Sequence, residues 1–135
     1  MLSFIPRHEL LLISRVLMSI LFFVMGWTKL MGFNAAVAYM QQTGAPVPEA
    51  SAILAIIVEL GSAIAIVLGV FLEPIAILLG IYTIITGIIG HHFWTMDGMM
   101  RYDMMIHFYK NISITGGLLA LAVAGPGKYA VQSRQ

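Results

Sequence analysis

The chain lacks cysteine altogether and is poor in charge. None of its 135 residues is Cys, and only 10% are Asp, Glu, Lys or Arg. Without a thiol, the chain can form no disulfide and can hold no zinc ion or iron–sulfur cluster through thiolates. Its net charge is +1, and it has no run of basic residues that would neutralise a phosphate backbone. Nucleic acid is therefore not expected as a partner.

Hydrophobic residues are what the chain has in abundance, at 60% of its length. About 20 apolar residues suffice for a helix to cross the hydrocarbon core of a bilayer. Four apolar runs occur, at residues 10–31, 50–72, 74–94 and 104–124. We therefore predict an all-α integral membrane protein, a bundle of four transmembrane helices forming a single domain over residues 1–135 in the lipid bilayer. A short helix between the first two spans, after Asn34, is predicted to lie in the membrane interface.

A single carboxylate, Glu59, stands near the middle of the second run. An ionised group at that depth costs about 2.5 to 3.5 kcal/mol on insertion scales unless it finds a partner inside the protein. On a helix, Glu59 shares a stripe with the small residues Ala52, Ala55 and Ala63. Small residues allow helices to approach closely, so this stripe is predicted to face the other helices and not lipid.

Two cations on the first span are candidate partners for Glu59. Arg15 and Lys29 fall on one helical stripe that also contains Gly26. The pattern does not decide which of them pairs with the carboxylate. In the alternative interpretation, both side chains extend to the two membrane surfaces and neither pairs with it.

Further polar side chains occur near one end of the third and fourth runs. His91 and Trp94 share a helical face, whereas His92 points about 100° away from them. On the last run, Asn111 lies on the predicted inner face, with Lys110 beside it. The predicted polar cluster therefore consists of Arg15, Lys29, Glu59, His91, His92, Trp94, Lys110 and Asn111.

An even number of spans would place both chain ends on one side of the membrane. The cations near span ends are Arg7, Arg15, Lys128 and Arg134 on the side of the termini, against Lys29, Arg101 and Lys110 opposite. Lys and Arg are enriched in cytoplasmic segments, so this bias predicts cytoplasmic termini.

Together these residues resemble the pattern of the DoxX family. The resemblance runs from about residue 15 to residue 127, and it is carried by Arg15, Gly26-Trp27-Thr28-Lys29-Leu30, Glu59 followed by Gly61, His91-His92-Phe93-Trp94 and Lys110-Asn111, with Tyr39-Met40 and the segment 44–48 between them. It implies a four-helix bundle in a bacterial inner membrane. The family takes its name from systems in which a related subunit passes electrons from thiosulfate to quinone. Other members are associated with membrane complexes for oxidative-stress defence and thiol homeostasis.

The resemblance and the polar cluster favour the membrane subunit of an oxidoreductase that binds a quinone. The two quinone oxygens need hydrogen-bond donors, which His91, Lys110 or Lys29 could supply, while Glu59 could relay protons. Trp94 could contribute a stacking wall. No flavin fold, haem-attachment motif or metal motif occurs in the sequence, so electrons would have to come from a redox partner protein.

Other functions fit the same residues. The charged residues could have a purely structural role and hold the helices together. The protein would then be a scaffold for a soluble redox partner or for further copies of itself. A small proton or solute transporter is a third hypothesis, although no discontinuous helix or inverted repeat is visible. His and Met side chains between residues 91 and 107 could suit Cu(I), but methionine is also an ordinary residue of apolar helices. The sequence thus predicts no metal site and identifies no catalytic residue.

Overall fold

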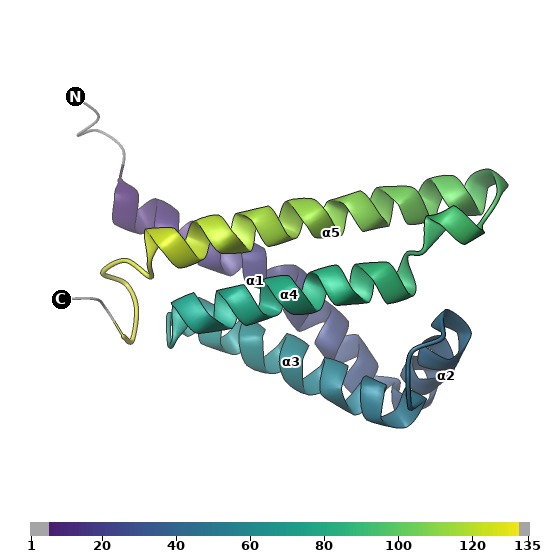
Figure 1. Cartoon of the computed structure of the whole chain (residues 1–135). Coiled ribbons are helices and arrows are strands. Elements are labelled where there is room, and N and C mark those ends of the chain that lie inside the picture. The colour runs from purple at the N-terminus through teal and green to yellow at the C-terminus, as the bar shows by residue number, and fades with distance from the viewer. Residues whose placement is uncertain (1–5, 133–135) are drawn as a thin grey trace.

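The computed structural model describes residues 6–132, which are helical and contain no strand (Figure 1). The elements are α1 (Arg7–Met31), α2 (Phe33–Thr43), α3 (Pro48–Leu68), α4 (Leu72–Gly90), the short 3₁₀ helix η1 (Phe93–Thr95) and α5 (Gly98–Ala124). The all-α prediction is confirmed for this part of the chain. Arg134, which entered the count of cations, lies outside the described residues.

The four long helices converge at the end that contains the α3–α4 turn, and α1 and α3 diverge from α4 and α5 toward the end that contains α2 (Figure 1). α1 packs mainly on α3 and α4 packs mainly on α5, with further contacts between α3 and α4 and between α1 and α5. The start of α1, the α3–α4 turn and the end of α5 lie at one end of the bundle, and α2 lies at the opposite end. There α2 contacts α1 and α3. The start of α5 and η1 project beyond the last turn of α4.

Local sequence explains where the second and third long helices begin and end. Pro48 occupies the first turn of α3, where its missing N–H is not needed. α3 ends at Leu68, and the following Gly69 has a φ of 69°, in the left-handed region that glycine adopts without strain. The turn before α4 therefore comprises residues 69–71. Glu73, which separates the second and third apolar runs in the sequence, and Pro74 belong to the first turn of α4.

Two further helix boundaries differ from the sequence-based expectation. The short helix starts at Phe33 after Gly32, one residue before the expected cap Asn34. The last helix begins at Gly98, directly after the extended residue Asp97, and not near Met104. The residues 99–105 are unbranched or aromatic and contain no proline, so they continue the helical hydrogen bonding instead of forming a loop.

Within residues 6–132, three segments are long and apolar enough to cross a membrane: α1, α3 and Leu72–Thr95. α5 has 27 residues, which is long enough, but its first half carries Arg101, Asp103 and Lys110. The fourth span and the interfacial position of α2 therefore stay predictions.

The apolar core fills the end of the bundle that contains the α3–α4 turn. It consists of Phe22, Ala63, Ile66, Leu72, Ala76, Leu79, Leu118, Leu121 and Ala122. On the outside, large side chains such as Leu17, Ile57 and Leu78 are more than 60% exposed. Such an apolar exterior fits a helix bundle surrounded by lipid. The buried polar groups of α1, α3 and α4 lie among the inward-facing residues, and they define the candidate site.

Candidate functional site

The inward faces of α1 and α3 are those that the sequence predicted. Arg15, Ser19, Phe22 and Gly26 are buried on α1. On α3 the buried residues are Ala52, Ala55, Glu59, Ala63 and Ile66. The two faces meet, and α1 and α3 therefore bring their polar residues together in the bundle interior.

Gly26 allows α1 to approach α3 at the level of the carboxylate. A Cβ atom on Gly26 would lie 2.8 Å from Cγ of Leu60 and 3.1 Å from Cβ of Glu59. The first distance is shorter than van der Waals contact permits, so any side chain at position 26 would push the two helices apart. The close approach places Lys29, one turn further along α1, beside Glu59.

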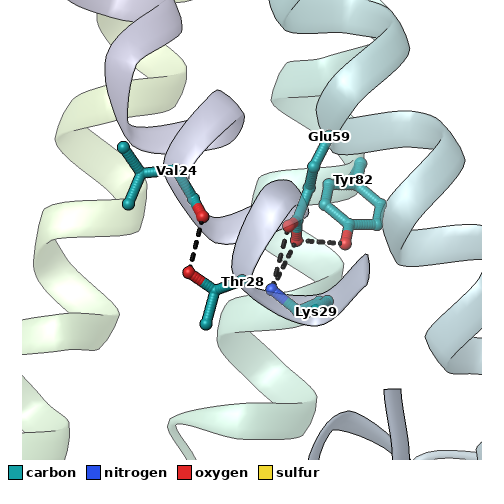
Figure 2. Close-up of polar contacts among 5 residues, drawn as sticks. All are labelled: Val24, Thr28, Lys29, Glu59 and Tyr82. Atoms are coloured by element: carbon teal, nitrogen blue, oxygen red, sulfur yellow. Dashed lines mark hydrogen bonds and ion pairs between the residues drawn. The ribbon is translucent and has the colours of Figure 1, made fainter. Parts of the chain in front are cut away.

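Lys29, Glu59 and Tyr82 form a polar triad contributed by α1, α3 and α4 (Figure 2). Lys29 Nζ lies 2.9 Å from Oε2 and 3.2 Å from Oε1 of Glu59. The Tyr82 hydroxyl donates to Oε1 at 2.8 Å. The Glu59 and Lys29 side chains are only 9% and 14% exposed. Lys29, and not Arg15, is thus the cation that pairs with the carboxylate.

The triad combines three groups that can share protons in a largely water-excluded setting. The carboxylate accepts hydrogen bonds from an ammonium group and from a phenol. The ammonium group of Lys29 has three N–H donors and can also bind a ligand oxygen, whereas the single O–H of Tyr82 is donated to Glu59. Thr28 is adjacent in sequence but does not belong to the triad, because its hydroxyl donates to the carbonyl of Val24 at 2.8 Å (Figure 2). Chemically, the triad can neutralise a buried charge, bind a carbonyl oxygen and pass a proton.

Asn111 lies at the α4–α5 contact and not in the triad. Its Nδ2 donates to the carbonyl of Thr83 at 3.0 Å. Gly87 makes room for it, since an added Cβ there would lie 3.1 Å from Asn111 Nδ2. The Thr115 hydroxyl lies 3.2 Å from the carbonyl of Gly80, one turn further along the same contact. Asn111 therefore ties α5 to α4.

The histidines form a separate group at the end of α4. The rings of His91 and His107 stack with their centroids 5.2 Å apart. Nδ1 of His91 is buried and has no hydrogen-bond partner among residues 6–132. His92 turns back toward its own helix, where Nδ1 lies 2.6 Å from the carbonyl of Ile89. Within the described chain, no hydrogen bond or ion pair connects these rings to the triad.

Trp94 and Lys110 lie at the periphery. α4 ends at Gly90, so Trp94 sits on η1, is 49% exposed and packs against Phe93 and Phe108. Lys110 is exposed and forms no ion pair with any residue that the structure describes. Within the described residues, neither forms a hydrogen bond or an ion pair with the triad. The predicted cluster therefore divides into several groups.

Arg15 is the most deeply buried charged group, with 0% of its surface exposed. Its Nη2 donates to the backbone carbonyl of Tyr129, in the segment that follows α5. It is thus covered by the C-terminal segment at the end of the bundle near the α3–α4 turn, away from Glu59. No group of three or more His, Cys, Asp or Glu side chains suited to a metal ion occurs in the described range.

Tyr82 is the residue of the triad that the sequence analysis missed. An aromatic residue in an apolar run is usually interpreted as part of the lipid-facing surface or of the apolar core. The signal that could have identified it is the hydroxyl, because a buried tyrosine O–H almost always needs an acceptor. Glu59 was the only carboxylate within the apolar part of the spans that could serve as this acceptor.

Comparison with known proteins places the chain in a family. The DoxX family profile matches residues 10–92. The chain is 45% identical over 128 residues to the inner membrane protein YphA of Escherichia coli (strain K12), covering 95% of this chain and 91% of the relative. It is 34% identical over 120 residues to the inner membrane protein YqjF of the same organism, covering 89% and 87%. No solved structure matches it. The chain is an integral inner-membrane protein and belongs to the DoxX family.

Proposed function

We propose that the protein is the membrane subunit of a redox system and binds the head group of a quinone at Lys29, Glu59 and Tyr82. The observation that carries this proposal is a buried carboxylate that accepts hydrogen bonds from two different helices. Ionisable groups held inside a membrane bundle are functional by default, since burying them is costly.

The triad has the groups that quinone chemistry requires. Reduction of a quinone to a quinol consumes two electrons and two protons, and the protons end on the two ring oxygens. Lys29 can donate a further N–H to one of these oxygens, Tyr82 can turn its single O–H from Glu59 to the same oxygen, and Glu59 can pass protons toward it. The electrons come from a partner redox protein, because the sequence has no motif for a flavin, haem or metal centre.

An apolar groove on the same helix pair suits the tail of such a ligand. The groove has a volume of about 350 Å³. It is lined by Val16, Ser19, Ile20, Phe23, Val24, Ala63, Ile64, Val67 and Leu68. Ala63, at one end of it, is about one helical turn from Glu59. An isoprenoid chain in this groove would therefore have its head group next to the triad.

Binding of a short-chain quinone to the purified protein in lipid nanodiscs tests the proposal. We expect Glu59→Gln and Tyr82→Phe to weaken binding by roughly tenfold each, because each removes one charged or polar contact of about 1.5 to 3 kcal/mol. Lys110→Gln is the matched control, since Lys110 is exposed and outside the triad. Equal affinity in all four proteins would contradict the proposal.

A structural role is the second candidate, and it is favoured by the fact that Glu59 has its partners inside the protein. Lys29 and Tyr82 satisfy the carboxylate without any ligand and thereby link α1, α3 and α4. Such a link can specify which helices meet without adding much stability. A scaffold of this kind would show no quinone binding in the wild type, and Glu59→Gln would impair assembly with the partner protein.

A further inference from the structure

The guanidinium group of Arg15 is buried with most of its hydrogen-bonding capacity unused. The side chain is 0% exposed, and its one hydrogen bond runs from Nη2 to the carbonyl of Tyr129. Nε and Nη1 are buried and have no partner among residues 6–132. An unpaired buried charge costs several kcal/mol, so such a group calls for an anion.

Arg15 lies at the depth of the lipid head groups. A Cβ added to Gly69 would overlap Nη1 of Arg15, so the guanidinium group touches the backbone of the α3–α4 turn. This turn joins two helices that are each apolar and long enough to span the membrane. It must therefore lie at the membrane surface, where the phosphates of phospholipids are found.

Hydrogen bonds from exposed residues hold the segment that covers Arg15. On the side of α1, the N–H of Lys128 donates to Nδ1 of His8 at 3.2 Å, and the Tyr129 hydroxyl donates to Oε1 of Glu9 at 2.9 Å. The backbone N–H of Val131 donates to the carbonyl of Leu68 at 2.8 Å. The N–H of Phe71, at the start of α4, donates to Oε1 of Gln132 at 2.8 Å. The segment thus supplies two oxygens: the carbonyl oxygen of Tyr129 to the guanidinium group of Arg15, and Oε1 of Gln132 to the N-terminus of α4. These are positions that the oxygens of a bound anion would take.

A pocket of about 260 Å³ lies beside this cover. Its walls include Gly69 and Phe71 from the turn, Gly125 and Pro126 directly after α5, and Gln132 from the covering segment. Glu73 also lines the pocket. Because a carboxylate repels an anion, the ligand has to bind away from Glu73, on the side where the segment 128–132 covers Arg15.

We propose that Arg15 and the N-terminus of α4 form a binding site for a phosphate anion, and that the segment 128–132 is a removable cover over it. The phosphate can belong to the head group of an anionic phospholipid or be free in solution. Binding displaces the carbonyl of Tyr129 and the side chain of Gln132, and it supplies acceptors to Nε and Nη1. The proposal concerns the end of the bundle away from the triad, and it does not depend on quinone binding.

Hydrogen–deuterium exchange of the full-length wild type tests the proposal. The amide of Val131 is protected by its bond to Leu68, and opening of the cover exposes it. We compare nanodiscs of phosphatidylcholine alone, the same nanodiscs with added inorganic phosphate, and nanodiscs that contain phosphatidylglycerol. We expect roughly tenfold faster exchange at Val131 with the ligand that binds. Acceleration by phosphatidylglycerol alone identifies the lipid as the source, and acceleration by inorganic phosphate shows that free phosphate also binds. No acceleration in either case overturns the proposal, and this wild-type measurement needs no variant.

Two variants assign the effect to the buried cation. Arg15→Gln should abolish the acceleration. Lys128→Gln is the matched control, because Lys128 is an exposed cation in the same segment, 3.7 Å from Glu9. It should leave the acceleration within about twofold of the wild type, as expected for a screened surface charge. If both variants lose the effect equally, the lipid responds to surface charge in general, and the site at Arg15 is refuted.

Discussion

Replacing Lys29 with Met tests whether the ion pair in the bundle interior is as tightly coupled as its geometry indicates. The variant keeps a long side chain but leaves Glu59 with the Tyr82 hydroxyl and without its cation. Removing one partner of a buried ion pair typically costs about 3 to 5 kcal/mol. Since the two side chains retain 14% and 9% exposure and the carboxylate can take up a proton, we expect the lower end of this range, about 3 kcal/mol.

A double-mutant cycle isolates the interaction. Glu59→Gln keeps the volume and the bond from Tyr82 and should cost about 1 to 2 kcal/mol. The double variant should be more stable than the sum of the two single effects implies, by roughly 1 to 3 kcal/mol, because the orphaned charge is gone. The free energy of unfolding can be measured by titrating micelles with sodium dodecyl sulfate and following the fluorescence of Trp27 and Trp94.

Lys110→Met provides the matched control for Lys29→Met. Lys110 is exposed, so its replacement should change the free energy of unfolding by no more than about 0.5 kcal/mol. If Lys29→Met costs no more than this control, or if the two single effects simply add, the reasoning about the buried pair is refuted.

Four further substitutions test helix contacts inside the bundle in the same titration. Gly26→Ala should destabilise the protein by about 1 to 3 kcal/mol, because the added Cβ would lie 2.8 Å from Cγ of Leu60. Gly61→Ala is the control: its Cβ meets nothing within 4 Å, so it should stabilise the protein by a few tenths of a kcal/mol up to about 1. Equal effects of the two substitutions would argue against the close α1–α3 contact. Tyr82→Phe should cost about 1.5 to 3 kcal/mol through the lost bond to the carboxylate, unless the hydroxyl is not bonded there. Asn111→Ala should cost about 1 kcal/mol and loosen α5 from α4, and an unchanged stability would show that its bond to Thr83 contributes nothing.

The inward faces of α1 and α3 were predictable because helical periodicity places residues three and four apart on one side. Glu59 among small residues and Lys29 near Gly26 were therefore identified correctly. The choice between Lys29 and Arg15 was not predictable, because it depends on how far α1 and α3 slide along each other. That relative position is set by contacts between the two helices, such as Gly26 against Leu60. The residue spacing within one helix does not predict such contacts.

The rest of the predicted cluster was dispersed for two physical reasons. The face that was extended to Trp94 assumed a continuous helix, but α4 ends at Gly90 and the following 3₁₀ turn points Trp94 outward. The residues after the run 104–124 were not assigned to any predicted element. They fold back to bind Arg15 through Tyr129, a contact between residues 114 positions apart that local patterns do not reveal.

Native mass spectrometry of the protein, extracted from its own membrane in mild detergent, tests the proposed function most directly. The account predicts that the 14.8 kDa chain carries a mass corresponding to a quinone, and that Glu59→Gln loses this mass while Lys110→Gln retains it. A chain that carries only phospholipid, in the wild type as in both variants, would contradict quinone binding at the triad.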